Sequence, residues 1–254
     1  MKSTYLRERA KLLKNNRALK NEIITDELIS GLPRLLQKYL RVCGYMNTPL
    51  PYNATVDWEE SIFKMSPGKD WKQMKTIQFN SVNPIARTAY MKFSGMPLSA
   101  RDIYSNGYGE MKGKLFNLIS VVFDNSAETA QSALITCFAE FLFIPGYIFS
   151  DNVKWETLND TTLRATLRDN GFEVTGLFHF DGEGFFRHFE TNDRYYSIGK
   201  NNYKKFRYSA FVDSYKNLGG LNIAENARAM WHLPHGGFEY FKGTIGTIDF
   251  NVDE

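Results

Sequence analysis

The sequence is poor in cysteine, and it has no long uninterrupted apolar run. Its 254 residues include two cysteines, Cys43 and Cys137, which lie far apart and indicate reduced structural thiols rather than a disulfide. The longest apolar stretch, at 133–149, contains Glu140 and Pro145 and is too short to cross a bilayer. The N-terminus is charged and lacks the apolar core of a signal peptide. Few cysteines and no targeting segment together predict a cytoplasmic location.

Sequence patterns typical of metal, cofactor or phosphate sites are also missing. His232 and His235 straddle a proline before two glycines, so they mark a turn rather than one face of a metal-binding helix. Gly107 and Gly109 are not followed by the Lys-Ser/Thr pair of a phosphate-binding loop. Cys137 lies in an apolar helical pattern, where a thiol is usually inert. The sequence therefore predicts no metal and no cofactor.

Positive charge is concentrated at one end of the chain. The net charge is +3, and residues 1–20 carry seven Lys or Arg against the single acid Glu8. The remaining residues are therefore mildly acidic, which argues against a nucleic-acid partner. The basic segment is either a solvated helix face or a weak peripheral contact with an anionic membrane, and the sequence leaves both interpretations open.

Two segments have a helical pattern. Residues 1–44 are expected to form an N-terminal helical arm, because apolar residues recur at helical spacing from Leu35 to Val42 and Gly44 ends the segment. One strong internal helix is expected near 126–143, with Asn125 as its cap.

The rest of residues 45–254 reads as one antiparallel β domain. Apolar and polar residues alternate with a period of two, and the runs follow one another at hairpin distances. About ten strands in one sheet rarely stay flat. The predicted class is therefore mainly β (α+β), with a strongly curved, many-stranded, half-barrel-like antiparallel sheet around the one central helix. Aromatic residues make up 15% of the chain, so the interior is either a plain core or an apolar cavity.

Asp102 and Tyr104 are two apart on an expected strand and so share one face. If this is the inner face, a carboxylate and a phenol can orient a ligand in a cavity. The alternative is structural, with Asp102 paired to Arg87 or Arg101 and Tyr104 packed in the core.

Glu140 is the most informative single residue, because its helical neighbours are almost all apolar. A buried carboxylate there can act as an acid or base, or it can form an ion pair with Arg87 or Arg194. Glu140, Asp102 and Tyr104 are therefore the candidate catalytic residues. The tryptophans at 58, 71, 155 and 231 can wall a cavity or belong to the core. The candidate ligand-binding residues are Gln78, Arg87, Asp102, Tyr104, Glu140, Trp155, Arg194 and Trp231.

Several motifs are spaced along the chain in a pattern that resembles a known family. They are Gln78-Phe79, Asp102-x-Tyr104-x-x-Gly107-x-Gly109-x-Met111, Glu140 with Pro145, Val153-x-Trp155-Glu156, Ala165-Thr166, Phe178-His179-Phe180-Asp181, Arg194-Tyr195 and Trp231-His232-Leu233-Pro234-x-Gly236-x-Phe238-x-Tyr240. From about residue 33 to residue 252 the chain resembles an uncharacterised bacterial domain-of-unknown-function family, as a soluble member. One departure is Phe206, where the family usually has a Trp-containing segment.

The resemblance implies a curved antiparallel sheet similar to those of bacterial lipoprotein carriers, and it names no activity. Many relatives have hydrophobic N-terminal segments, whereas this N-terminus is basic, so no membrane location is implied. Three functions stay open. The first is binding of a hydrophobic or amphipathic small molecule, such as a lipid, in the concave face. The second is an enzyme that uses a buried carboxylate, and the third is a structural or interaction module without a cavity.

Overall fold

The structure is a computed structural model that describes residues 1–16 and 22–253, so the basic residues at 17 and 20 lie outside the described ranges. The strands are β1 (Asn53–Phe63), β2 (Lys72–Ser81), β3 (Ala86–Phe93), β4 (Leu98–Ser105), β5 (Tyr108–Leu115), β6 (Ile119–Asp124), β7 (Val153–Asn159), β8 (Thr162–Asp169), β9 (Phe172–Phe180), β10 (Phe186–Thr191), β11 (Tyr195–Gly199), β12 (Asn202–Lys205), β13 (Tyr208–Leu218), β14 (Leu221–Leu233) and β15 (Gly236–Phe250). The helices are α1 (Lys2–Asn15), α2 (Asp26–Ile29), α3 (Arg34–Val42) and α4 (Ala127–Ala139), followed by the 3-10 turns η1 (Phe141–Phe143) and η2 (Pro145–Phe149).

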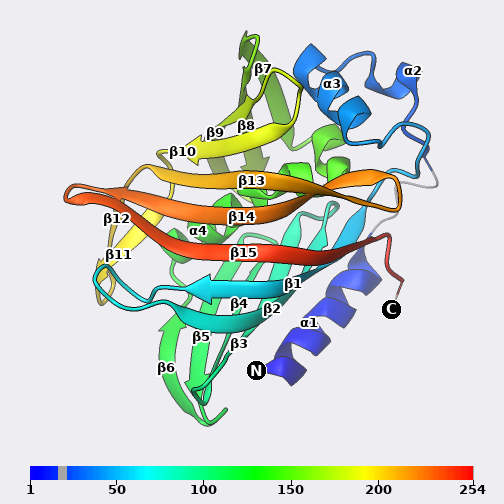
Figure 1. Ribbon diagram of the computed structural model, residues 1–254. Coiled ribbons are helices and arrows are strands. Elements are labelled where there is room, and N and C mark those ends of the chain that lie inside the picture. The colour runs from blue at the N-terminus through cyan, green and yellow to red at the C-terminus, as the bar shows by residue number, and fades with distance from the viewer. Residues whose placement is uncertain (17–21, 254) are drawn as a thin grey trace.

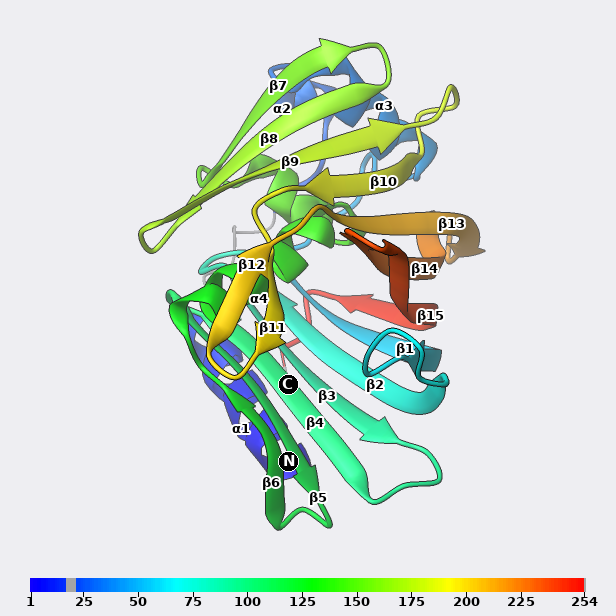
Figure 2. The same cartoon turned by 90° about the vertical axis from the view of Figure 1, so that its left-hand side faces the viewer.

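Thirteen of the described strands form one antiparallel sheet in the order β6-β5-β4-β3-β2-β1-β15-β14-β13-β10-β9-β8-β7, and β11 and β12 form a separate hairpin. The sheet curves strongly and wraps around α4, as Figures 1 and 2 show. This confirms the predicted class, a curved antiparallel half-barrel with a central helix. The sheet therefore has more strands than the roughly ten expected.

Alternation along β3 explains how the sheet has two different faces. Arg87 points to the concave face, where it reaches the end of α4, and Ala89 and Met91 follow on the same side. Tyr90 points to the convex face, where its ring meets Tyr5 of α1 at 6.4 Å between centroids. The period of two in the sequence therefore separates the residues that face α4 from those under α1.

Helix α4 packs on the concave face, mainly along β5 and β4 and also against β9. Ser126, rather than the expected Asn125, caps it, because the Ser126 hydroxyl accepts the backbone N–H of Thr129 at 3.1 Å. Phe138 packs edge-on against the rings of Phe178 and Phe189. Gly176 permits this contact, because a Cβ there would lie 2.2 Å from Phe189. The part of the concave face between α4 and strands β9 and β10 is thus filled by aromatic core.

The N-terminal helix α1 lies along the convex face, beside β2 and β3 (Figure 1). Its buried residues are Tyr5 and Leu12. The division of the chain at residue 44 into an arm and a β domain stays a prediction. Among the described residues, no helix is both long and apolar enough to cross a membrane.

Candidate functional site

Arg87 is the centre of a buried polar network on the concave face. Its Nη1 donates to both carboxylate oxygens of Asp102, at 2.9 and 3.0 Å, and its Nε donates to Oε2 of Glu140 at 2.9 Å. Only about a tenth of the Arg87 side chain is exposed. Burial alone would lower the pKa of Arg87, but the carboxylates of Asp102 and Glu140 outweigh it and raise the pKa above its ordinary value. Asp102 and Glu140 thus have the arginine partner that the structural interpretation expected.

Gln78 connects this arginine to the wall of the sheet. Its Oε1 accepts from Nη2 of Arg87 and from Nε1 of Trp58, each at 3.0 Å. Its Nε2 donates to Asn80 at 3.0 Å and to Glu140 at 2.9 Å. All four hydrogen-bonding positions of this amide are therefore used, which holds the Trp58 ring and the Glu140 carboxylate in place.

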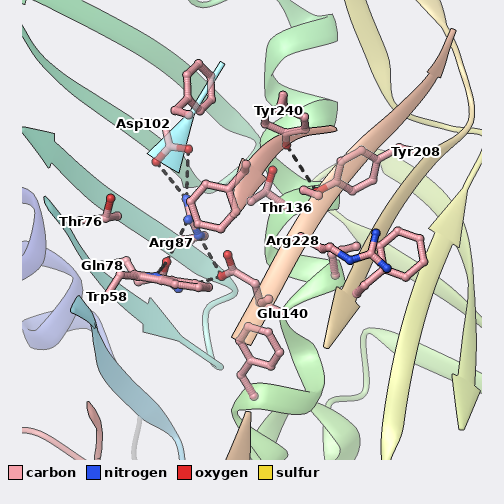
Figure 3. Close-up of a pocket in the computed structure, with 18 of the residues that line it drawn as sticks. Trp58, Thr76, Gln78, Arg87, Asp102, Thr136, Glu140, Tyr208, Arg228 and Tyr240 are labelled. Atoms are coloured by element: carbon pink, nitrogen blue, oxygen red, sulfur yellow. Dashed lines mark hydrogen bonds and ion pairs between the residues drawn. The ribbon is translucent and has the colours of Figure 1, made fainter. Parts of the chain in front are cut away.

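Glu140 follows α4 directly, where the chain leaves the helix. Its Oε2 accepts three hydrogen bonds, from Gln78, from Arg87 and from Asn80, the last at 3.2 Å. Figure 3 shows Arg87 between Asp102 and Glu140, with Tyr208 and Arg228 across the pocket. The end of the helix therefore places one carboxylate against three donors from strands β2 and β3.

A cavity of about 150 Å³ lies between this network and strands β13 to β15. Most of its lining is apolar and includes Phe63, Met74, Met91, Met111, Phe143 and Phe241. Methionine side chains are flexible and adapt to ligands of irregular shape. The concave face is therefore filled by core near α4 and hollow beside the polar network.

Arg194 also lines this cavity, but its partners are neutral. Its Nη1 donates to the Tyr240 hydroxyl at 3.1 Å, and its Nη2 donates to Oγ1 of Thr136 at 3.0 Å. Its guanidinium lies 4.0 Å from the centre of the Tyr208 ring and 5.1 Å from that of Trp231. Burial raises the pKa of Tyr208, so this phenol is neutral and gives no counter-charge.

Within the described part of the chain, Arg194 forms no ion pair, and its buried Nε has no hydrogen-bond partner. Arg228, a third arginine in the cavity lining, differs in this respect. Its Nε donates to both carboxylate oxygens of Asp213, at 3.0 and 3.1 Å, and its Nη1 reaches Glu239 at 3.4 Å. Of the arginines at 87, 194 and 228, only Arg194 has no carboxylate partner among the described residues.

A second pocket of about 150 Å³ adjoins the first, and the two share Asp102, Met111, Thr136 and Arg194 in their linings. Its other lining residues are mostly polar and come from α4, β5, β6 and the β11–β12 hairpin. Arg194 therefore lies where an apolar cavity meets a polar one.

Three candidate residues from the sequence lie outside the cavity lining. Tyr104 is buried in the core, and its hydroxyl donates to Asp169. Trp155 donates to the backbone oxygen of Ile148 at 3.2 Å. Trp231 does not line the cavity, but the Arg194 guanidinium lies over its ring, 5.1 Å from the centre. The structure therefore brings together Gln78, Arg87, Asp102, Glu140 and Arg194, and separates Tyr104 and Trp155 from them.

Several polar residues of the site were missed by the sequence analysis, among them Asn80, Thr136, Tyr208, Arg228 and Tyr240. Asn80 had a usable signal, since it continues the alternation of Gln78 along β2. Thr136, Tyr208 and Tyr240 had none, because they come from α4, β13 and β15 and meet only after long-range pairing. In the described residues, no group of three or more His, Cys, Asp or Glu is placed to hold a metal ion.

Comparison with known proteins assigns the family. The profile of DUF6544, a family of unknown function, matches residues 22–243, and the chain therefore belongs to this family. This confirms the expected resemblance to a domain of unknown function. No curated protein matches the chain.

Three solved structures are similar to the fold. A DUF1329 family protein from Desulfovibrio piger has a TM-score of 0.47 at 10% identity, covering 87% of this chain and 92% of that one. A LolA superfamily protein from Nitrosomonas europaea has a TM-score of 0.47 at 10% identity, with coverages of 86% and 92%. A domain named for outer membrane lipoprotein sorting, from Vibrio parahaemolyticus, has a TM-score of 0.45 at 13% identity, with coverages of 80% and 86%. These likenesses of fold agree with the expected lipoprotein-carrier-like sheet.

The predicted cytoplasmic location is wrong on these comparisons, because one similar structure is named for outer membrane lipoprotein sorting. The prediction depended on the low number of cysteines and on the lack of a recognisable targeting segment. Cys43 and Cys137 are both free and buried on separate helices. Burial raises the pKa of the Cys43 thiol to about 12, which makes it unreactive. Two inert thiols are compatible with an oxidising compartment as well as with a reducing one.

Proposed function

We propose that this protein binds a small amphipathic molecule, such as a lipid, in the concave cavity, with the anionic group of the ligand on Arg194. The observation that carries the proposal is the missing counter-charge of Arg194. A guanidinium is always charged and binds carboxylates and phosphates with two parallel hydrogen bonds. Arg194 lines the apolar cavity, so an anionic headgroup can pair with its guanidinium while the apolar part of the ligand fills the hollow.

The size of the cavity limits the apolar part of the ligand. About 150 Å³ is the size of a cavity that holds benzene, so a ring or a short alkyl segment fits it. The second pocket begins at Arg194 and is polar. A ligand with a short apolar portion, an anionic group in the middle and a polar remainder matches this order of surfaces.

The acid–base alternative has no observation in its favour. Oε2 of Glu140 already accepts three hydrogen bonds, and taking a proton there would break at least one of them. Both oxygens of Asp102 accept from Arg87. The carboxylates are thus arranged to hold Arg87 and the wall of the cavity.

Calorimetric titration with octanoate and with octanol tests the proposal, since the two ligands share a chain and differ in charge. Wild-type protein is expected to bind octanoate more tightly than octanol. Arg194→Gln is expected to weaken octanoate binding about 10- to 100-fold, because charged hydrogen bonds are lost, and to leave octanol binding within about twofold. Arg194→Lys is expected to lie between them, because it keeps the charge and loses the planar fork.

Arg168→Gln is the matched control, because Arg168 is exposed on β8 and pairs with Glu173 at 2.6 Å, outside the cavity lining. This variant is expected to bind octanoate like the wild type. Equal affinity of the wild type for octanoate and octanol, or unchanged octanoate binding in Arg194→Gln, would rule out the assigned role of Arg194. Native mass spectrometry of the purified protein then identifies any molecule that co-purifies in the cavity.

A further inference from the structure

The hairpin of β5 and β6 exposes an unusual amount of apolar surface. Leu118 is 81% exposed, Phe116 66% and Ile119 61%. Val121, Val122 and Phe123 are also exposed, so apolar side chains face water along the length of β6. The hairpin projects at the lower end of the molecule in both Figure 1 and Figure 2. Large exposed apolar patches of this kind usually mark an interaction surface.

The turn of this hairpin adds a second observation. Phe116 has φ of 52° and Asn117 has φ of 59°, so both lie in the left-handed region. Asn tolerates this conformation, whereas a bulky residue such as Phe is strained by it. Phe116 is thus both strained and exposed, although the backbone of the turn is hydrogen-bonded, with the N–H of Phe116 donating to the oxygen of Pro97 at 2.7 Å and the N–H of Leu118 to that of Leu115 at 3.0 Å.

Basic side chains lie next to the apolar tip. Lys112 places its Nζ 5.3 Å from the centre of the Phe123 ring, and Lys114 lies opposite Ser120 in the strand pairing. In the described ranges neither lysine forms an ion pair with a carboxylate. The exposed Lys2 and Arg7 belong to α1, which packs on the same convex face. The tip is therefore apolar with a cationic margin.

We propose that the hairpin of β5 and β6 docks on an anionic membrane surface, with Phe116, Leu118 and Ile119 inserted at the interface and the lysines against the lipid headgroups. Short apolar tips with adjacent Lys or Arg bind such surfaces through buried area and electrostatic attraction together. Phe116, Leu118 and Ile119 line neither pocket, although other residues of the same hairpin do, so insertion of the tip does not require the proposed ligand. It also differs from a contact through the basic N-terminus alone.

A second copy of the chain fits this edge less well. Pairing two β6 strands would bring the lysines of both neighbouring β5 strands toward one another. The pairing of β5 and β6 is also interrupted by a bulge between Gly113 and Lys114, and bulges twist an edge away from further strand pairing. An anionic membrane offers an apolar interior to the side chains at the tip and negatively charged headgroups to the lysines.

Vesicle flotation tests the proposal with purified full-length protein. Wild-type protein is expected to float with phosphatidylcholine vesicles that contain phosphatidylglycerol and to stay behind with pure phosphatidylcholine. Leu118→Glu is expected to lower the bound fraction at least about tenfold, because an inserted leucine is replaced by a charge. Leu158→Glu, on the opposite edge strand β7 and 39% exposed, is the matched control and is expected to float like the wild type.

The charge contribution is tested by the double variant Lys112→Glu with Lys114→Glu. Its binding is expected to fall at least about 25-fold, at about fivefold for each lost cation, and wild-type binding is expected to weaken as salt rises. Circular dichroism should show unchanged melting for Leu118→Glu, because the side chain touches little else. Failure of the wild type to float, or equal floating of Leu118→Glu, overturns the proposal. A wild-type dimer that Leu118→Glu converts to monomer would assign the edge to a second copy and overturn it as well.

Discussion

Arg87 and Arg194 lie in the lining of one cavity and have opposite surroundings. Arg87 donates to the two carboxylates of Asp102 and Glu140 and to the amide oxygen of Gln78. Arg194 donates to two hydroxyl groups and stacks on two aromatic rings. Among the described residues, the first arginine has its counter-charges within the fold, and the second has none within ion-pair distance.

This difference separates a structural arginine from a binding one. A buried ion pair recovers its desolvation cost only when both charges are present and fully hydrogen-bonded, as they are around Arg87. A guanidinium held on aromatic faces stays in place without a carboxylate, and it keeps its attraction for an anion that arrives later. The same residue type therefore stabilises one wall of the cavity and supplies the proposed ligand contact on the other.

The largest expected effect tests the structural half of this comparison. Arg87→Met removes the cation between Asp102 and Glu140 and leaves the buried carboxylate of Glu140 and the partly buried carboxylate of Asp102 without their charged partner. We expect the free energy of unfolding to fall by about 3–5 kcal/mol, measured by urea denaturation. The matched variant Arg194→Met loses two hydrogen bonds to neutral groups and is expected to lose about 1–2 kcal/mol. Equal losses in the two variants would remove the distinction between the arginines.

A smaller effect is expected at Glu140. Glu140→Ala leaves Nε of Arg87 and the amide nitrogens of Gln78 and Asn80 without their shared acceptor, although Arg87 keeps Asp102. We expect a loss of about 2–3 kcal/mol by urea denaturation. Glu140→Gln keeps one acceptor oxygen and is expected to lose about 1 kcal/mol. Full thermal stability of Glu140→Ala would show that this carboxylate does not support the network.

The sequence was sufficient for the fold class and for one wall of the site. A period of two along β3 predicts that Arg87, Ala89 and Met91 share a face, and the apolar helix before Glu140 predicts a buried carboxylate. Local periodicity cannot say which element covers a face. Asp102 and Tyr104 were predicted only to share one face of β4, and in the structure Asp102 borders the cavity while Tyr104 lies in the core against Asp169.

The opposite wall of the cavity could not be predicted. Tyr208 and Tyr240 come from β13 and β15, which are separated by β14 in the sheet, and Arg194 reaches them from the segment before β11. Their meeting depends on strand pairing over long sequence distances and on the curvature of the whole sheet. The missing carboxylate at Arg194 is likewise a property of three-dimensional packing, because Asp193 stands next to it in the sequence and instead accepts the backbone N–H of Thr175.

The smallest expected effect comes from removing one of the two carboxylates paired with Arg87, so that its surroundings become more like those of Arg194. Asp102 is 22% exposed, so its pair with Arg87 is less desolvated than the pair with Glu140. Asp102→Asn keeps an oxygen that can accept from Arg87 and is expected to cost about 1 kcal/mol of stability. It also removes one negative charge from the cavity lining, so octanoate affinity is expected to rise about threefold by calorimetric titration. The same substitution in an Arg194→Gln background should raise affinity by a similar factor from a much lower base, since the field of Arg87 acts in both. A fall in octanoate affinity in Asp102→Asn would mean that Asp102 itself touches the ligand, and that the charge of the cavity is not set by the two arginines alone.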